Sequence, residues 1–271
     1  MPADDPPGSV AAVQIEWSGD IEGVFWVEGV EYRCLTSLKQ GNRAPGQLLV
    51  MKNPRVVRRY LELIEREQPR NILELGIYAG GSTALFAQLA APDRLAALDF
   101  SPDPQPDLAR FVDEHDLGDV VALHYGVDQA DADALDRIVA GFDGALDLVI
   151  DDASHLEAQT RASFNRLFPH LRPGGCYVIE DWAWAHQIFP PSDPQYHGVT
   201  PMSLVVLECV LACARHPDLI TEVVTDKQWA LVRRGPADLP PGTFDLSARL
   251  DPVGRRMVEQ AATVRSRAPR P

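Results

Sequence analysis

The sequence predicts an α/β fold in which a mostly parallel sheet of seven strands carries helices on both faces and ends in an antiparallel hairpin strand. Two observations lead to this prediction. From residue 71 onward, short apolar runs alternate with amphipathic stretches, which is the pattern of parallel strands joined by right-handed crossover helices. The last two apolar runs, 219–224 and 228–233, are separated by only three residues, so they must pair in antiparallel fashion.

The elements before this alternating region are a hairpin and a helix. Residues 24–34 alternate around a Glu-Gly pair, which is typical of two short antiparallel strands. Asn53 and Pro54 then have the residue types of an N-cap and a first helical residue, and apolar positions recur behind them at helical spacing.

Each strand of the alternating region is predicted where a β-favouring apolar run is bounded by turn residues. The strands are expected at 71–75, 94–99, 120–124, 146–150, 175–180, 219–224 and 228–233. The helices between them are expected at about 81–91, 105–116, 131–140, 156–170 and 201–215. We therefore divide the chain into an N-terminal extension, an α/β domain and a C-terminal tail that is weakly helical near its end, with bounds of 1–50, 51–235 and 236–271.

Composition and charge narrow the range of partners. The chain has 271 residues, of which 45% are hydrophobic and 24% charged, as in ordinary globular proteins. Its formal net charge of −14 would repel a phosphate backbone, so we expect no nucleic-acid partner. The start shows no cationic and apolar signal segment, and no apolar run reaches about 18 residues, so we expect a cytoplasmic protein without a membrane partner. The four cysteines lack CxxC spacing and are interpreted as thiols rather than zinc ligands.

A glycine-rich loop follows the first strand of the alternating region. Residues 74–82 read ELGIYAGGS and lead into the next predicted helix. Glycine is needed where the backbone meets a ligand closely or takes unusual dihedral angles, and a helix start offers unpaired N–H groups. The loop therefore predicts a nucleotide-like cofactor, with a tight turn that binds nothing as the alternative.

Acidic residues end the next two strands. Asp99 closes the second strand, where a carboxylate accepts hydrogen bonds from ribose hydroxyls. A nicotinamide cofactor is the competing interpretation, but the glycine spacing differs from GxGxxG and a hairpin closes the sheet. Asp128 follows the third strand. For this residue, a role as a solvated loop acid or as the cap of the next helix is weighed equally with the cofactor contact that the resemblance described below implies.

Two acidic clusters follow two consecutive strands. Asp151 and Asp152 come after the strand at 146–150, and Glu180 and Asp181 come at the end of the next one. Because parallel strands end at one edge of a sheet, these carboxylates should converge and repel one another unless a cation such as Mg²⁺ lies between them. Neighbouring strand residues face opposite ways, so we expect Asp152 to face the metal and Asp151 the cofactor.

His155 is the candidate general base. The sequence Ser154-His155-Leu156-Glu157 matches a capping box, which places His155 in the first turn of a helix. The positive helix end and a nearby cation would both keep its imidazole neutral and able to accept a proton near pH 7. His186 and His197 are alternative bases on the following loop.

These motifs together resemble the class I S-adenosylmethionine (SAM) methyltransferases, which have a Rossmann-like fold. The DDASH and IEDW segments resemble the metal-dependent O-methyltransferases of antibiotic sugars, with the related rhamnosyl and cephalosporin hydroxylase-like families. The resemblance covers about residues 50–235. It implies SAM contacts from Glu74, Gly76, Tyr78, Gly80, Ser82, Asp99, Asp128 and Asp151. It implies Mg²⁺ ligands at Asp152, Glu180 and Asp181, with His155 as the base.

The resemblance implies an enzyme that methylates a sugar hydroxyl, on a deoxysugar of a natural product or on a nucleotide sugar. A homo-oligomer is expected from the resemblance alone. A catechol-type O-methyltransferase and a SAM-binding protein that does not methylate are the alternatives. Four aromatic residues on the segment after the fifth strand form either a wall over the sugar face or a packed lid: Trp182, Trp184, Phe189 and Tyr196.

Overall fold

The computed structural model describes residues 14–16, 23–36, 46–186 and 199–266. Two compact units can be distinguished in the chain, and each is described by itself. The first unit comprises residues 1–70, 77–95 and 103–122. The second unit comprises residues 71–76, 96–102 and 123–271. The segment boundaries expected after residues 50 and 235 stay predictions.

The first unit contains a small sheet whose described strands lie in the order β1-β2-β3-β4. These strands are β1 (Gln14–Glu16), β2 (Gly23–Val27), β3 (Val30–Cys34) and β4 (Leu48–Val50). The predicted hairpin is confirmed, because β2 and β3 pair antiparallel. Glu28 and Gly29 both have positive φ angles, of 49° and 85°, as the tightest hairpin turns require.

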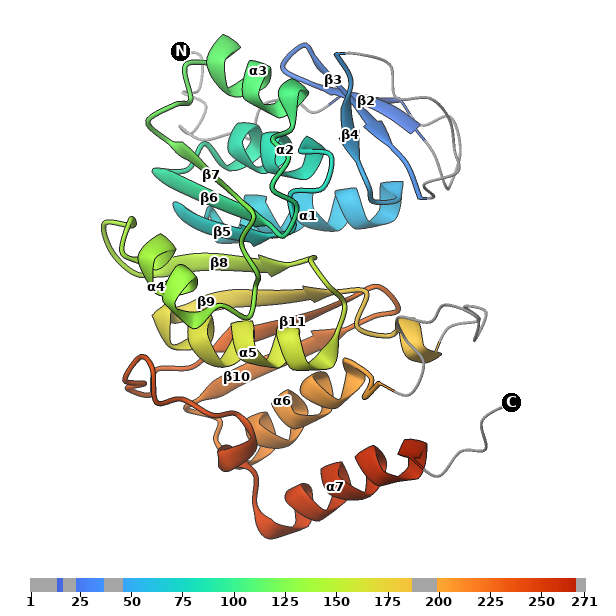
Figure 1. Ribbon diagram of the computed structural model, residues 1–271, viewed down its shortest axis with the longest axis vertical. Coiled ribbons are helices and arrows are strands. Elements are labelled where there is room, and N and C mark those ends of the chain that lie inside the picture. Colours follow the sequence, from blue (N-terminus) through green and yellow to red (C-terminus); the bar gives the residue numbers. More distant parts are fainter. Residues whose placement is uncertain (1–13, 17–22, 37–45, 187–198, 267–271) are drawn as a thin grey trace, which may run out of the picture. The chain divides into compact units, whose positions relative to one another are not determined.

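Three helices belong to the first unit (Figure 1). They are α1 (Pro54–Glu67), α2 (Gly81–Ala90) and α3 (Pro106–Glu114). The predicted cap of α1 is confirmed, since the side chain of Asn53 accepts hydrogen bonds from the backbone N–H groups of Arg55 and Val56 at 3.0 and 3.1 Å. Tyr60 of α1 packs against Phe86 of α2 with ring centroids 4.9 Å apart, which joins the two helices through their apolar faces.

The larger sheet has seven strands in the described part of the chain, in the order β10-β11-β9-β8-β5-β6-β7. The strands are β5 (Asn71–Leu75), β6 (Arg94–Asp99), β7 (Val121–Tyr125), β8 (Leu146–Asp151), β9 (Leu171–Glu180), β10 (Ile220–Thr225) and β11 (Trp229–Arg234). β8 pairs parallel with β5 and with β9, whereas β11 pairs antiparallel with β9 and with β10. The predicted mostly parallel sheet with a late antiparallel hairpin strand is therefore confirmed.

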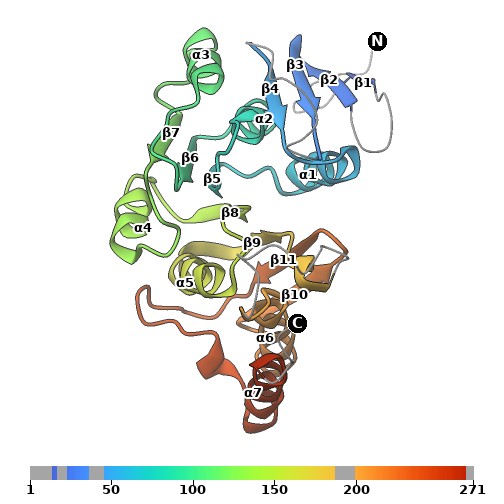
Figure 2. The ribbon, with the colours of Figure 1, turned by 45° about the vertical axis from the view of Figure 1, so that its right-hand side comes forward.

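In its described residues, the second unit has four α-helices: α4 (Ala132–Val139), α5 (Glu157–Leu167), α6 (Ser203–Arg215) and α7 (Pro252–Ser266). Figures 1 and 2 show α5 beside β9 and α6 beside β10. The helix predicted to reach residue 170 ends earlier, because Pro169 cannot continue it and residues Phe168–His170 form a 3-10 turn instead. Within the described residues, no helix combines the length and hydropathy that crossing a bilayer requires.

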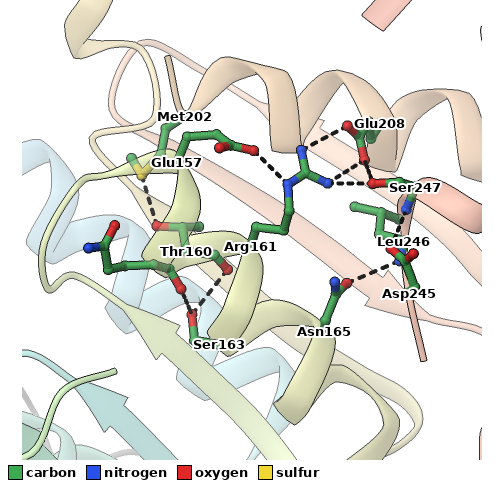
Figure 3. A network of polar contacts seen from close by, with 11 residues as sticks. Glu157, Thr160, Arg161, Ser163, Asn165, Met202, Glu208, Asp245, Leu246 and Ser247 are labelled. Atoms are coloured by element: carbon green, nitrogen blue, oxygen red, sulfur yellow. Dashed lines mark hydrogen bonds and ion pairs between the residues drawn. The ribbon is translucent and has the colours of Figure 1, made fainter. Parts of the chain in front are cut away.

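The first part of the C-terminal segment packs against α5. The Phe244 ring lies 6.4 Å from that of Phe164 and 5.7 Å from that of Phe168, and Phe244 is buried. The backbone N–H of Leu246 donates to the Asn165 side chain at 3.0 Å (Figure 3). Residues 239–250 therefore contribute to the core of the second unit, and the helix expected near 252–264 is present as α7.

Candidate functional site

The candidate site lies in the second unit, at the carboxyl ends of β8 and β9. The two strands are adjacent and parallel, with Asp151 opposite Ile179. Asp152 follows β8 directly, and Asp181 follows β9 directly. This topology is why the two acidic clusters meet, as the sequence predicts.

Asp152, His155 and Asp181 form a compact group of polar side chains. One ligand atom from each lies within 4.8 Å of those of the other two, and His155 Nε2 is 3.8 Å from Asp152 Oδ1. The side chains of Asp152 and His155 are only 19% and 15% exposed. Two carboxylate oxygens and one imidazole nitrogen at this spacing suit a divalent cation, so the donor set fits a metal.

Glu180 is placed differently from the other predicted metal ligands. It is the last residue of β9 and is buried, and the chain turns sharply after it, with a φ of 53° at Asp181. The backbone N–H of Asp181 donates to the carbonyl of Gln228 at 2.5 Å. Among the described residues, Glu180 lies outside the group formed by Asp152, His155 and Asp181. Its role as a ligand stays a prediction.

The predicted capping box is wrong. α5 begins at Glu157 with the apolar Leu156 as its N-cap, and Ser154 Oγ accepts from the backbone N–H of Leu156 at 3.2 Å. His155 precedes the helix in a left-handed conformation, with a φ of 54°, which a right-handed helix does not accommodate. His155 is therefore not in the first helical turn, and the argument that the helix dipole keeps it neutral no longer holds.

Aromatic residues pack on this site from the segment after β9. The ring of Trp184 lies 4.3 Å from that of His155, at an interplanar angle of 46°. The indole N–H of Trp182 donates to the carbonyl of Asp226 at 2.9 Å. Both indoles are thus packed against the protein itself. Of the predicted aromatic wall and the alternative bases, Phe189, Tyr196 and His197 lie outside the described residues.

His186 lies in the 3-10 turn Trp184–His186, immediately after these aromatic residues. Its Nε2 is 2.7 Å from Ser203 Oγ, and the contact is exposed. Ser203 begins α6, so this contact ties the 3-10 turn to that helix.

Asp151 is buried in a polar network that sequence reasoning missed. Gln129 Nε2 donates to both of its carboxylate oxygens, at 3.0 and 3.2 Å. Ser163 Oγ and Tyr177 OH donate to Oδ2 at 2.9 and 3.1 Å. Burial raises the pKa of Asp151 to about 6, although these hydrogen bonds oppose the shift. The predicted cofactor role of Asp151 stays a prediction.

The glycine loop begins in the second unit with Glu74 and Gly76. Glu74 is fully buried in β5. Gly76 has a φ of 102°, and a Cβ on it would lie 2.1 Å from the carbonyl oxygen of Asp152. The backbone of Gly76 therefore approaches the loop after β8 too closely for any side chain. Glycine is thus required here by contact with the protein backbone, and the predicted close approach to a cofactor stays a prediction.

The rest of the loop belongs to the first unit. Tyr78 has a φ of 48° and is 50% exposed. Gly80 is the N-cap of α2 with a φ of 84°, and a Cβ on it would lie 2.6 Å from Leu108 Cβ. Ser82 is buried in the first turn of α2. Their roles in cofactor binding stay predictions.

The two other predicted cofactor residues lie after β6 and β7. Asp99 ends β6, and its Oδ1 accepts from the backbone N–H of Ser101 at 2.8 Å. Asp128 is exposed, and its Oδ1 accepts from the backbone N–H of Ala130 at 2.8 Å. The cap of α4 is Asp131, so the alternative role of Asp128 as that cap is wrong.

The chain is similar to known methyltransferases. Residues 73–182 match the sequence model of a family described as a methyltransferase domain. The chain is 35% identical over 163 residues to the mycinamicin VI 2''-O-methyltransferase of Micromonospora griseorubida. It is 34% identical over 149 residues to the demethylmacrocin O-methyltransferase of Streptomyces fradiae. The matched parts are 57% and 52% of this chain.

A solved structure is similar in both fold and sequence. MycE, a methyltransferase from the mycinamycin biosynthetic pathway solved in complex with Mg and SAH, matches with a TM-score of 0.50 and 25% identity. The match covers 81% of this chain and 56% of MycE. The chain spans little more than a third of the length of the two curated relatives, 37% and 35%.

Proposed function

We propose that this chain, in which residues 73–182 form a methyltransferase domain, is a SAM- and Mg²⁺-dependent O-methyltransferase of a sugar hydroxyl. The observation that carries the proposal is the group of Asp152, His155 and Asp181 at the ends of two parallel strands within this domain. The proposal is supported by the names of the two relatives, which are O-methyltransferases of mycinamicin VI and of demethylmacrocin, and by the Mg and SAH bound to MycE.

The metal would be held by Asp152 and Asp181, with Glu180 as the third ligand expected from the resemblance. When bound, Mg²⁺ supplies a positive charge that lowers the pKa of an acceptor hydroxyl. His155 would accept the proton of that hydroxyl on its imidazole. SAM, when bound, would supply the methyl group for the acceptor oxygen, with S-adenosylhomocysteine as the leaving group. The protein contributes mainly by fixing the acceptor oxygen and the methyl group in line.

For SAM, the proposal assigns the second-unit residues Glu74, Gly76, Asp99, Asp128 and Asp151. Asp99 would accept hydrogen bonds from the ribose hydroxyls, as carboxylates at this strand end do in dinucleotide folds. Gly76 would let the backbone approach the cofactor closely. The first-unit residues Tyr78, Gly80 and Ser82 complete the set expected from the resemblance.

The proximity of His155 to both aspartates leaves two roles for it, and one experiment separates them. A His155→Phe variant should keep the Mn²⁺ affinity of the wild type and lose most of its methyl transfer if His155 is the base. The same variant should lose Mn²⁺ affinity if the imidazole is a ligand, because the phenyl ring offers the cation no donor atom. Asp113→Ala, at an exposed acid of α3, is the matched control for altered charge.

The function itself is tested by calorimetric titration of SAM with and without Mg²⁺, followed by methyl transfer to sugar-bearing and catechol acceptors. We expect SAM to bind, and we expect a Mg²⁺ heat that Asp152→Ala abolishes. Binding of NAD(H) in place of SAM would overturn the methyltransferase assignment. Methyl transfer to catechols but to no sugar would favour the catechol-type alternative, and SAM binding without any transfer would favour a non-methylating protein.

A further inference from the structure

The loop that carries Asp152 and His155 is short and held in an unusual shape. His155 has a left-handed φ of 54°, a conformation that is unfavourable for a residue with a side chain. Such a residue keeps this conformation only where its surroundings fix it. The contacts that hold residues 152–155 therefore determine whether Asp152 and His155 stay together.

Two of these contacts hold the ends of the loop. One comes from the neighbouring strand β5, and the other is formed between residues close together in the sequence. The backbone N–H of Asp152 donates to the carbonyl of Leu75 in β5 at 2.9 Å. Ser154 Oγ accepts from the backbone N–H of Leu156 at 3.2 Å. These contacts fix the two ends of the loop.

The middle of the loop is held by a residue from elsewhere in the chain. Gln129, which lies between β7 and α4, is only 3% exposed. Its Oε1 accepts from the backbone N–H of Ser154 at 2.9 Å. Its Nε2 donates to both carboxylate oxygens of Asp151 and lies 3.3 Å from Ser163 Oγ.

The Gln129 carboxamide thus forms a bridge from a rigid carboxylate to the loop. Asp151 is the last residue of β8, and its carboxylate also accepts from Ser163 of α5 and Tyr177 of β9. An amide suits this bridge because it offers a donor to the carboxylate and an acceptor to the N–H at the same time. The position of Ser154, between Asp152 and His155, is therefore set by the core of the second unit.

We propose that Gln129 is a positioning residue, whose hydrogen bond to Ser154 holds Asp152 and His155 in the arrangement that binds the divalent cation. This inference rests on the proposed function of the Asp152–His155–Asp181 group. Residues that orient metal ligands in this way typically contribute about 10- to 100-fold to metal affinity.

The test compares Gln129→Leu with the wild type, using Mn²⁺ alone as the probe and electron paramagnetic resonance to measure its binding. We expect Mn²⁺ affinity to fall by about tenfold or more. Amide hydrogen exchange of the 152–156 segment should become faster, because the Ser154 N–H loses its acceptor. The matched control is Gln260→Leu on the exposed face of α7, which should change neither quantity.

Gln129→Met removes the same hydrogen bonds with a side chain close to glutamine in length, and it serves if the leucine variant does not fold. We expect this variant also to show faster exchange at Ser154 and weaker Mn²⁺ binding than the wild type. Wild-type Mn²⁺ affinity in Gln129→Leu, with Ser154 exchange accelerated, would overturn the positioning role alone. A wild type that binds no Mn²⁺ would overturn the proposed metal site and this inference together, so the two failures are distinguishable.

Discussion

Removal of the Arg161 side chain should destabilise the second unit strongly. Arg161 of α5 donates to both carboxylate oxygens of Glu208 in α6, at 2.7 and 2.8 Å, and also to Glu157 at 2.5 Å and Ser247 at 2.8 Å (Figure 3). The Glu208 side chain is only 1% exposed. Although burial by itself lowers the pKa of Arg161, its contacts with Glu208 and Glu157 outweigh burial and raise it.

The size of this loss of stability follows from the environment that Glu208 keeps after the substitution. Arg161→Met leaves the Glu208 carboxylate buried with the Ser247 hydroxyl, which donates to it at 3.1 Å. Loss of one partner of a buried ion pair costs about 3–5 kcal/mol. At about 2–4 °C per kcal/mol for chains of this size, the midpoint of thermal unfolding should fall by about 6–20 °C.

Differential scanning calorimetry measures the fall in the unfolding midpoint. Two further variants show whether the buried charge of Glu208 is its cause. Arg161→Met/Glu208→Leu removes both charges and should recover most of the lost stability. Arg70→Met breaks the exposed pair with Asp93 and should leave the midpoint close to that of the wild type, because solvent screens this pair. A midpoint for Arg161→Met within 2 °C of the wild type, or a double variant no more stable than the single one, would refute the reasoning.

Three further predictions concern the site. Gly76→Ala places a methyl group 2.1 Å from the Asp152 carbonyl oxygen and should cost about 1–3 kcal/mol of strain, seen as weaker Mn²⁺ and SAM binding by calorimetry. Gly118→Ala is the control: a Cβ at Gly118 would meet no described atom within 4 Å, so this variant should bind Mn²⁺ and SAM as the wild type does. Trp184→Ala should lower kcat for methyl transfer about tenfold because the His155 ring loses the indole that packs against it, and Trp184→Phe should restore much of it; equal rates in all three proteins would contradict this. Burial raises the pKa of Asp151 from 3.8 to about 6, so the folded protein holds this proton more tightly than the unfolded chain, and stability is lost as the pH rises through this range. In metal-free buffer, Asp151→Asn should therefore gain about 2 kcal/mol relative to the wild type between pH 4 and pH 7 in urea unfolding, and an unchanged difference would count against it.

The sheet could be predicted from the sequence because β5, β6, β8, β9 and β11 are mostly buried apolar runs with clear turn residues between them. The convergence of Asp152 and Asp181 was predictable for the same reason, since parallel strands end at one edge. The N-cap at Asn53 depends on three adjacent residues, so local sequence was sufficient for it.

The parts that sequence reasoning missed depend on distant contacts or on backbone strain. The S-x-x-E spacing of residues 154–157 is compatible with a capping box. Because His155 has a left-handed φ, however, it cannot lie in the helix, and α5 begins only at Glu157. Gln129 contacts Asp151 and Ser154 across 22 and 25 residues of sequence. A lone glutamine after a strand carries no signal for such a bridge, because its partners become neighbours only once the sheet has formed.

The close approach of Gly76 to Asp152 has a thermodynamic consequence. The loop after β5, which we assign to SAM, and the loop after β8, which we assign to the cation, share a contact with no room for a methyl group. A ligand that fixes one loop therefore restricts the other. Occupancy of the two sites should be cooperative, and linkage requires the effect to be reciprocal: Mg²⁺ should tighten SAM binding by the same factor by which SAM tightens Mg²⁺ binding.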